Sequence, residues 1–328
     1  MLAAPAPMHI PDGFLSVLVS IVLWIISIIV IAYSLKRVNE DLDERKVVLM
    51  GVMAATIFAG QMLNFTVVGG TSGHLMGAAI ATILLGPWAA VLVMTSVVAV
   101  QALIFQDGGL VVMGANIFNM AVIGVAVSFF VYRTVRSVSG DRKWGIYVGG
   151  FAAAWFSVVA AALAAALELA ISGTSPANIA IPAMAGIHAL IGIGEGLITL
   201  GALALVGASR PDLLQVGEGK TASSAVLWLA GLAIAIALAI AAPLASSNPD
   251  GLEFVAEQQG FLELAREPLY ELIPDYVFPG LSNEALATII AGIVGALLVF
   301  GVAIIVAYSR RKAVRQPVMH SDKPGEDS

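Results

Sequence analysis

Four histidines are the strongest candidates for metal binding in this sequence. The 328 residues contain no cysteine, which excludes a thiolate zinc site, an iron–sulfur cluster, a disulfide and a catalytic thiol. His9 precedes the first long apolar stretch, His74 follows the second, His188 lies within a later one, and His320 is in the polar C-terminal tail. We therefore expect any metal site to use nitrogen or oxygen donors.

Met8 and His9 form a chelating pair if Met8 is the N-terminal residue. The free amine of Met8, the backbone nitrogen of His9 and its Nδ1 atom would close adjoining five- and six-membered rings around one ion, and His74 would add a fourth nitrogen. Such a near-planar nitrogen set suits Ni²⁺ or Cu²⁺ and extends to Co²⁺, whereas Mg²⁺ and Ca²⁺ prefer oxygen. Either histidine alone is more typical of a solvated group at a helix end, but two on one face favour a site.

The elements that position these residues are predicted to be transmembrane helices. The chain is 59% hydrophobic and 12% charged, against about 45–50% and about 25% in soluble proteins. Seven apolar stretches, six of them uncharged and one containing only Glu195, reach the length of about 20 residues that a helix needs to cross a bilayer. They are Phe14–Leu35, Val47–Val68, Leu110–Tyr132, Gly145–Leu167, Ala183–Gly207, Ser224–Leu244 and Leu286–Tyr308.

Two further segments bring the count to nine. No Asp, Glu, Lys or Arg occurs between Val47 and Gln106, and glycines and a proline break this tract. We predict a short helix over His74–Leu85 and a full span over Trp88–Phe105. The fold class is therefore an all-α integral membrane protein, with a seven-helix domain and a C-terminal two-span unit.

The distribution of basic residues predicts the orientation, because Lys and Arg concentrate in cytoplasmic loops. With the N-terminus outside and nine crossings, fifteen of the sixteen basic residues fall inside and only Arg266 falls outside. We predict a multi-pass protein of the cell membrane with a cytoplasmic C-terminus. The formal charge of −6 gives no support for nucleic-acid binding.

The chain divides into two membrane units. We expect a metal-capture domain over residues 8–208, a cytoplasmic linker over 209–223, a two-span unit over 224–315 and a disordered tail over 316–328. The outer loop of the second unit, Ala245–Ala285, carries eight acidic residues and a single basic one.

Five motifs in order resemble the CbiM/NikM family, the metal-capture subunits of energy-coupling-factor (ECF) transporters for cobalt and nickel. The second unit is similar to the CbiN/NikN partner, because Pro249–Glu253 reads PDGLE and Phe254–Phe261 follows it. The five motifs are MHIPDGFLS (Met8–Ser16), QMLNF (Gln61–Phe65), GHLMGA (Gly73–Ala78), GANIFNMA (Gly114–Ala121) and HALIGIGEGLIT (His188–Thr199).

This resemblance implies both the ligands and the partners. It implies that Met8, His9 and His74 bind Co²⁺ or Ni²⁺ as the transported substrate, with cobalt slightly favoured by its prevalence in the family. A CbiQ/NikQ-like coupling subunit and CbiO/NikO-like ATP-hydrolysing subunits would be the partners, in a lipid membrane. The chain departs from the family pattern at Met1–Pro7, which would acylate the Met8 amine; we therefore expect the functional N-terminus to be Met8.

Several polar residues within apolar segments are candidates for orienting the metal-site loops. Their alternative role is hydrogen bonding between helices, and for His188 and Glu195 a structural contact with each other. These candidates are Asp12, Gln61, Asn64, Asn116, Asn119, His188 and Glu195.

Two other functions remain as alternatives. A membrane metalloenzyme could use His188, Glu195 and Glu168, but no H-E-x-x-H motif occurs. A self-sufficient secondary transporter would be expected to show inverted repeats, and none is evident. The stretch 213–221 (LLQVGEGKT) lacks the first glycine of a phosphate-binding loop, so we expect no ATPase activity and no other enzymatic activity in this chain.

Overall fold

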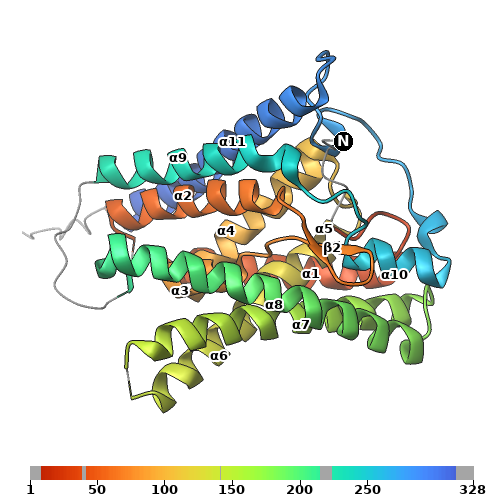
Figure 1. The fold of residues 1–328 in the computed structure, drawn as a ribbon, viewed down its shortest axis with the longest axis horizontal. Coiled ribbons are helices and arrows are strands. Elements are labelled where there is room, and N and C mark those ends of the chain that lie inside the picture. The colour runs from red at the N-terminus through yellow and green to blue at the C-terminus, as the bar shows by residue number, and fades with distance from the viewer. Residues whose placement is uncertain (1–8, 39–41, 141, 215–223, 315–328) are drawn as a thin grey trace, which may run out of the picture.

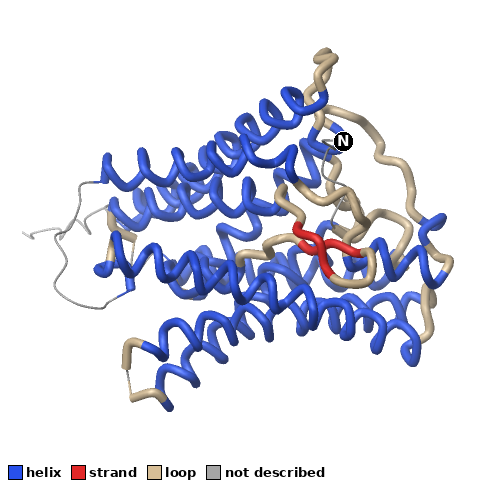
Figure 2. The backbone as a smooth tube through the Cα atoms, in the orientation of Figure 1, coloured by secondary structure: helices blue, strands red, loops and turns tan. Residues whose placement is uncertain are grey.

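The computed structural model describes residues 9–38, 42–140, 142–214 and 224–314, and it is built almost entirely of helices (Figure 1). The one sheet in this part of the chain is a small hairpin (Figure 2). The α-helices are α1 (Val17–Arg37), α2 (Glu44–Gln61), α3 (Ala78–Leu85), α4 (Pro87–Val100), α5 (Met113–Ile117), α6 (Gly124–Val138), α7 (Trp144–Ser172), α8 (Ala177–Ser209), α9 (Ser224–Ala241), α10 (Gly251–Gln259) and α11 (Glu284–Val314).

Seven helical segments of the described chain are long and apolar enough to cross a bilayer, which confirms the predicted fold class. The outward face of α1 carries exposed apolar residues such as Leu18 and Ile29, 71% and 61% accessible, as expected of a surface that contacts lipid. The seven segments are Val17–Arg37, Pro87–Phe105, Met113–Val138, Trp144–Ser172, Ala177–Ser209, Val226–Leu244 and Glu284–Arg311.

The other two predicted segments are the helices α2 and α3, which bring the total to nine. Helix α2 is buried on nearly all sides, and its first turn carries Glu44, Arg45 and Lys46. Helix α3 has eight residues and so rises only about 12 Å, which is less than half the bilayer core of about 30 Å.

Several predicted boundaries are wrong, and two of them are instructive. The span predicted over Val47–Val68 ends at Gln61, because β1 (Phe65–Val67) turns back through Gly69 and Gly70 to pair with β2 (Thr71–Gly73). Both glycines have positive φ, which suits a tight turn. In a second case, the span predicted over Ala183–Gly207 begins earlier, because α8 begins at Ala177 and includes Pro182.

Two long helices contain π-helical turns. The turn η2 (Gln101–Phe105) extends α4, and η3 (Phe118–Ile123) joins α5 to α6. A π-turn inserts an extra residue and changes the direction of nearby side chains, and such turns are frequent at functional sites. Gln101 and Asn119 lie on these turns.

The C-terminal helices pack against the N-terminal part of the chain. In Figure 1, α9 and α11 lie beside α2 at one edge of the bundle, and α6 and α7 form the opposite edge. A Cβ atom at Gly231 of α9 would lie 2.0 Å from Val52 Cγ1 of α2, so the two helices approach closely only because residue 231 is glycine. The segment between α9 and α11 folds over one end of the bundle and contains α10, η6 (Leu262–Leu264) and η7 (Pro274–Tyr276).

Candidate metal centre

The two candidate ligands lie side by side at the end of the bundle covered by α10. His9 precedes α1 and is 6% exposed, and His74 directly follows β2. Their ring centroids are 5.9 Å apart, and the ring planes meet at 61°. Both Nε2 atoms are buried without a hydrogen-bond partner in the described part of the chain. Two residues 65 positions apart thus present unpaired ring nitrogens in one place.

The backbone nitrogen and Nδ1 of His9 converge on a single point. The His9 N–H donates to Asp107 Oδ1 at 3.1 Å, and His9 Nδ1 lies 2.9 Å from the same oxygen. These are the two His9 atoms that the chelate requires, and they face one position from two directions. The carboxylate oxygen of Asp107 occupies that position in the structure.

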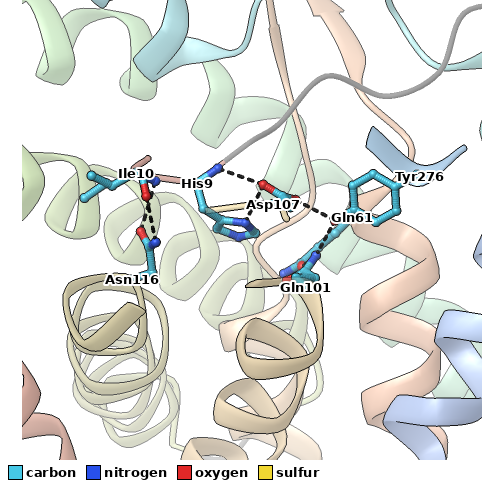
Figure 3. A network of polar contacts seen from close by, with 7 residues as sticks. All are labelled: His9, Ile10, Gln61, Gln101, Asp107, Asn116 and Tyr276. Atoms are coloured by element: carbon cyan, nitrogen blue, oxygen red, sulfur yellow. Dashed lines mark hydrogen bonds and ion pairs between the residues drawn. The ribbon is translucent and has the colours of Figure 1, made fainter. Parts of the chain in front are cut away.

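Asp107 belongs to a buried chain of hydrogen bonds that leads away from His9 (Figure 3). Its Oδ2 atom accepts from the hydroxyl of Tyr276 at 2.5 Å. Gln101 donates to that hydroxyl oxygen at 3.1 Å and to Gln61 Oε1 at 2.7 Å. Gln61 in turn donates to the carbonyl of Met76 at 3.0 Å, two residues beyond His74. The chain therefore links the segments that carry both histidines.

The N-terminal segment is fixed by side chains that contact its backbone. Asn116 accepts from the Ile10 N–H at 3.0 Å and donates to the Ile10 carbonyl at 3.1 Å. Asp12 accepts from three successive backbone N–H groups, those of residues 110, 111 and 112, at 3.0–3.1 Å. Both residues thus fix this segment through hydrogen bonds to backbone groups; their role in orienting metal ligands stays a prediction.

The segment after His74 is fixed by a buried glutamate of α8. Glu195 accepts from the Met76 N–H at 2.7 Å and the Gly77 N–H at 2.9 Å. Gly77 caps the N-terminus of α3, where unpaired backbone N–H groups favour an acceptor with negative charge. Glu195 contributes to the site by holding the backbone next to His74.

The two histidines open into a cavity of about 100 Å³. Its wall includes the predicted residues Asn116, Asn119 and His188, and also Asp250 of the PDGLE motif. The ring of His188 lies with Nδ1 2.8 Å from the Met184 carbonyl, so the contact with Glu195 considered from the sequence does not form. Asn119 donates to Glu168 Oε2 at 2.9 Å.

Asn64 is a predicted site residue that takes no part in the hydrogen bonds described above. It is 4% exposed, and both polar side-chain atoms are without a hydrogen-bond partner among the described residues. It shares a helical spacing with Gln61 in the sequence, but α2 ends at Gln61. Asn64 therefore does not lie on the same helix as Gln61.

The two histidines differ in how readily they take up a proton. Burial, together with the nearby charge of His9, lowers the pKa of His74 to about 3, so its imidazole is neutral at physiological pH. Burial also lowers the pKa of His9, but the charge of Asp107 and the hydrogen bonds to it outweigh burial and raise the pKa of His9 above its usual value. A metal ion thus competes with a proton at His9 but not at His74.

The described residues hold no group of three or more His, Cys, Asp or Glu arranged for a metal ion. Two imidazoles are available, so further donors must come from elsewhere. The His9 backbone nitrogen is one, since it faces the same point as Nδ1. Met8, the predicted source of an amine, lies outside the described residues.

Sequence reasoning missed three residues at this end of the molecule: Asp107, Asp250 and Tyr276. Asp107 could have been recognised, because it is the first charged residue after the uncharged tract from Val47 to Gln106. Asp250 accepts from the Glu253 N–H at 2.7 Å and caps α10, and burial raises its pKa to about 7. Tyr276 carries no sequence signal, because only the folding of residues 245–283 over the bundle brings it to Asp107.

Comparisons with known proteins give matches for both units of the chain. A family described as "Cobalt uptake substrate-specific transmembrane region" matches residues 9–213, and a "PDGLE domain" matches residues 225–312. The "Putative fused nickel transport protein NikMN" of Archaeoglobus fulgidus is 39% identical over 297 residues, which cover 89% of this chain and 95% of that protein. The "Fused nickel transport protein NikMN" of Rhodobacter capsulatus is 32% identical over 338 residues, covering 90% and 96%.

A solved structure, "Crystal Structure of an transition metal transporter", is 33% identical with a TM-score of 0.56. It covers 63% of this chain and 97% of the solved chain. The family match alone extends over more than half of the sequence. This chain belongs to the CbiM family of cobalt uptake substrate-specific transmembrane proteins, and it carries a PDGLE domain in the same polypeptide.

Proposed function

We propose that this chain is the substrate-binding membrane component of an ECF-type ABC transporter that imports Co²⁺ or Ni²⁺. The observation that carries the proposal is the convergence of His9 N and Nδ1 on one buried point beside His74. The named relatives are nickel and cobalt transport proteins, so we assign this chain a transport role and no enzymatic one.

The proposed ligand set is the amine of Met8, the backbone nitrogen and Nδ1 of His9, and an imidazole nitrogen of His74. Adjacent donors on one short stretch of backbone form chelate rings, so an amine one residue before His9 reaches an ion that His9 also binds. Four nitrogens suit Ni²⁺ geometrically, while the family description names cobalt. Both ions therefore remain proposed substrates.

We propose that the metal enters from outside at the end that holds His9. The opposite end carries the basic residues predicted to be cytoplasmic. Arg45 and Arg210 there contact Asp212, and Arg310 donates to the Leu35 carbonyl at 3.2 Å. A membrane coupling subunit and ATP-hydrolysing subunits, CbiQ/NikQ-like and CbiO/NikO-like, would act from that side.

Metal titration of the purified chain in nanodiscs tests the ligands. His9→Ala and His74→Ala should each weaken Ni²⁺ and Co²⁺ binding at least about 100-fold, because loss of an outer partner of a metal ligand already costs about 10–100-fold. His320→Ala is the matched control, since it removes an imidazole that the sequence places in the C-terminal tail. Unchanged affinity in both of the first two variants would contradict the site.

Uptake into vesicles tests the energy source. With the ATP-hydrolysing and coupling subunits present, metal should accumulate only when ATP is supplied. Uptake by this chain alone, driven by an ion gradient, would instead support the secondary transporter considered from the sequence.

A further inference from the structure

Tyr276 reaches the metal centre from a part of the chain that no sequence pattern connects with it. It is fully buried and lies in η7, between α10 and α11. Its φ is 58° and that of Asp275 is 52°, both in the left-handed region. Residues without glycine's freedom keep such angles where the surrounding structure holds them there. The backbone thus delivers this side chain to one defined place.

We propose that Tyr276 is a positioning residue for the metal ligand His9 and acts through Asp107. Its hydroxyl holds the carboxylate that directs both His9 nitrogens toward one point. The inference rests on the proposed function, because it takes His9 as a ligand. It adds a residue of the C-terminal unit to the metal centre.

The hydroxyl of Tyr276 is itself fixed from two sides. Its ring stacks on Phe105 at 4.9 Å between centroids and 17° between planes, and it also contacts Phe58 at 6.0 Å. Gln101 donates to its oxygen at 3.1 Å, which leaves the hydroxyl proton to point at Asp107 Oδ2, 2.5 Å away. A rigid donor on one carboxylate oxygen restricts the rotation of the whole carboxylate.

That restriction passes to His9 through the second carboxylate oxygen. Oδ1 is within 3.1 Å of both the His9 backbone nitrogen and Nδ1, so its place sets the side-chain rotamer of His9. A cation must take the place of Oδ1 next to these nitrogens. During that exchange, the Tyr276 hydroxyl stays hydrogen-bonded to Asp107 Oδ2, so the displaced carboxylate keeps a partner. The His9 side chain is already in the rotamer that binds the cation, so binding requires no change of rotamer.

Two tyrosine variants of the full chain test the proposal. Tyr276→Phe keeps the packed ring and removes the donor, so Ni²⁺ affinity should fall about 2- to 10-fold, the cost of ordering one side chain on binding. Tyr270→Phe is the matched control, because its hydroxyl, in the same segment, donates to the Leu103 carbonyl at 2.9 Å. Its affinity should equal that of the unmodified chain.

A double-variant cycle separates positioning from a general effect on folding. Asp107→Asn should also weaken Ni²⁺ binding, and adding Tyr276→Phe to it should cause little further loss, because the hydroxyl acts through Asp107. In the metal-free protein, the ¹⁵N resonance of His9 Nδ1 should shift in Tyr276→Phe and not in Tyr270→Phe. If Tyr276→Phe does not fold, unchanged Ni²⁺ binding in Asp107→Asn still overturns the proposal, because the hydroxyl acts through Asp107.

Unchanged or tighter Ni²⁺ binding by folded Tyr276→Phe would overturn the proposal, as would fully additive losses in the double variant or an unshifted His9 resonance. Full affinity in His9→Ala would instead reject the ligand assignment and the proposed function with it. Loss of binding in His9→Ala together with unchanged binding in Tyr276→Phe would reject the positioning role alone. The two failures are thus distinguishable.

Discussion

At the end of the molecule that holds His9, the polar groups in contact with His9 are buried; at the opposite end the ion pairs are partly exposed. The side chains of His9 and Asp107 are 2% and 1% accessible, whereas Arg45, which contacts Asp212, is 29% accessible. A buried polar group needs defined hydrogen-bond partners, so the side chains at the first end form a hydrogen-bond network of fixed geometry. An exposed ion pair contributes only about 0–1 kcal/mol, so the second end is held by the helices and carries charge chiefly on its surface.

The largest effect on metal affinity at the end that holds His9 is expected from changes at Met8. Extra residues fused to the amine of Met8 convert it to an amide, so they should weaken Ni²⁺ binding about as much as His9→Ala, at least about 100-fold by the reasoning for ligands. Residues added after Ser328 are the control and should change nothing. Titration should accompany mass spectrometry of the intact N-terminus. Full-affinity binding by a chain that demonstrably keeps Met1–Pro7 would remove the amine from the ligand set.

The next effect concerns two buried asparagines. Asn116→Ala removes both hydrogen bonds to the Ile10 backbone, so the loop that carries His9 loses its anchor and Ni²⁺ affinity should fall about 10–100-fold. Asn64→Ala is the control, because the Asn64 side chain forms no hydrogen bond with the described residues. Equal losses of Ni²⁺ affinity in the two variants, measured by titration, would show that Asn116 contributes only its side-chain volume and not its hydrogen bonds.

Measurements of metal binding and of histidine protonation over a range of pH distinguish His9 from His74. Because the pKa of His9 is raised, its imidazole takes up a proton as pH falls through that value. Displacing this proton should add about a further tenfold weakening of metal binding per pH unit below that value, beyond the pH dependence that the amine and amide donors, which also lose protons, already cause. His74, with a pKa of about 3, should stay neutral down to about pH 4. NMR of ¹⁵N-labelled histidines in the metal-free chain measures both. A His74 that titrates near pH 6.5 would contradict the burial argument.

Most of the fold could be predicted because lipid imposes one simple rule. Spans need length and low charge, and the long segments follow from those two properties. The errors fall where backbone geometry determines the secondary structure. The composition of residues 65–67 also suits the end of an apolar helix, but these residues pair with residues 71–73 as two strands. The span predicted to begin at Ala183 belongs to α8, which begins at Ala177 and contains Pro182. Apolar composition alone does not distinguish these cases.

Candidates for the site could be proposed from the sequence where its residues lie within the five motifs. Asp12 and Asn116 were expected to orient loops, and the structure gives them backbone partners. Asp107 and Tyr276 escaped prediction, because their contact joins residues 169 positions apart and depends on how the C-terminal segment covers the bundle. Local spacing carries no information about such a contact.

The smallest effect is expected at the end opposite His9. Arg45→Gln removes the contact with Asp212, which also accepts from Arg210 at 3.0 Å, so Asp212 keeps a partner and the free energy of unfolding should change by no more than about 1 kcal/mol. Ni²⁺ affinity should stay within about 2-fold, since the pair shares no partner with the network around His9. Thermal unfolding and metal titration of the same preparation check both values. A tenfold loss of Ni²⁺ affinity would mean that the two ends are coupled through the helices between them. The buried network around His9 and the basic residues at the opposite end could then not be treated as independent.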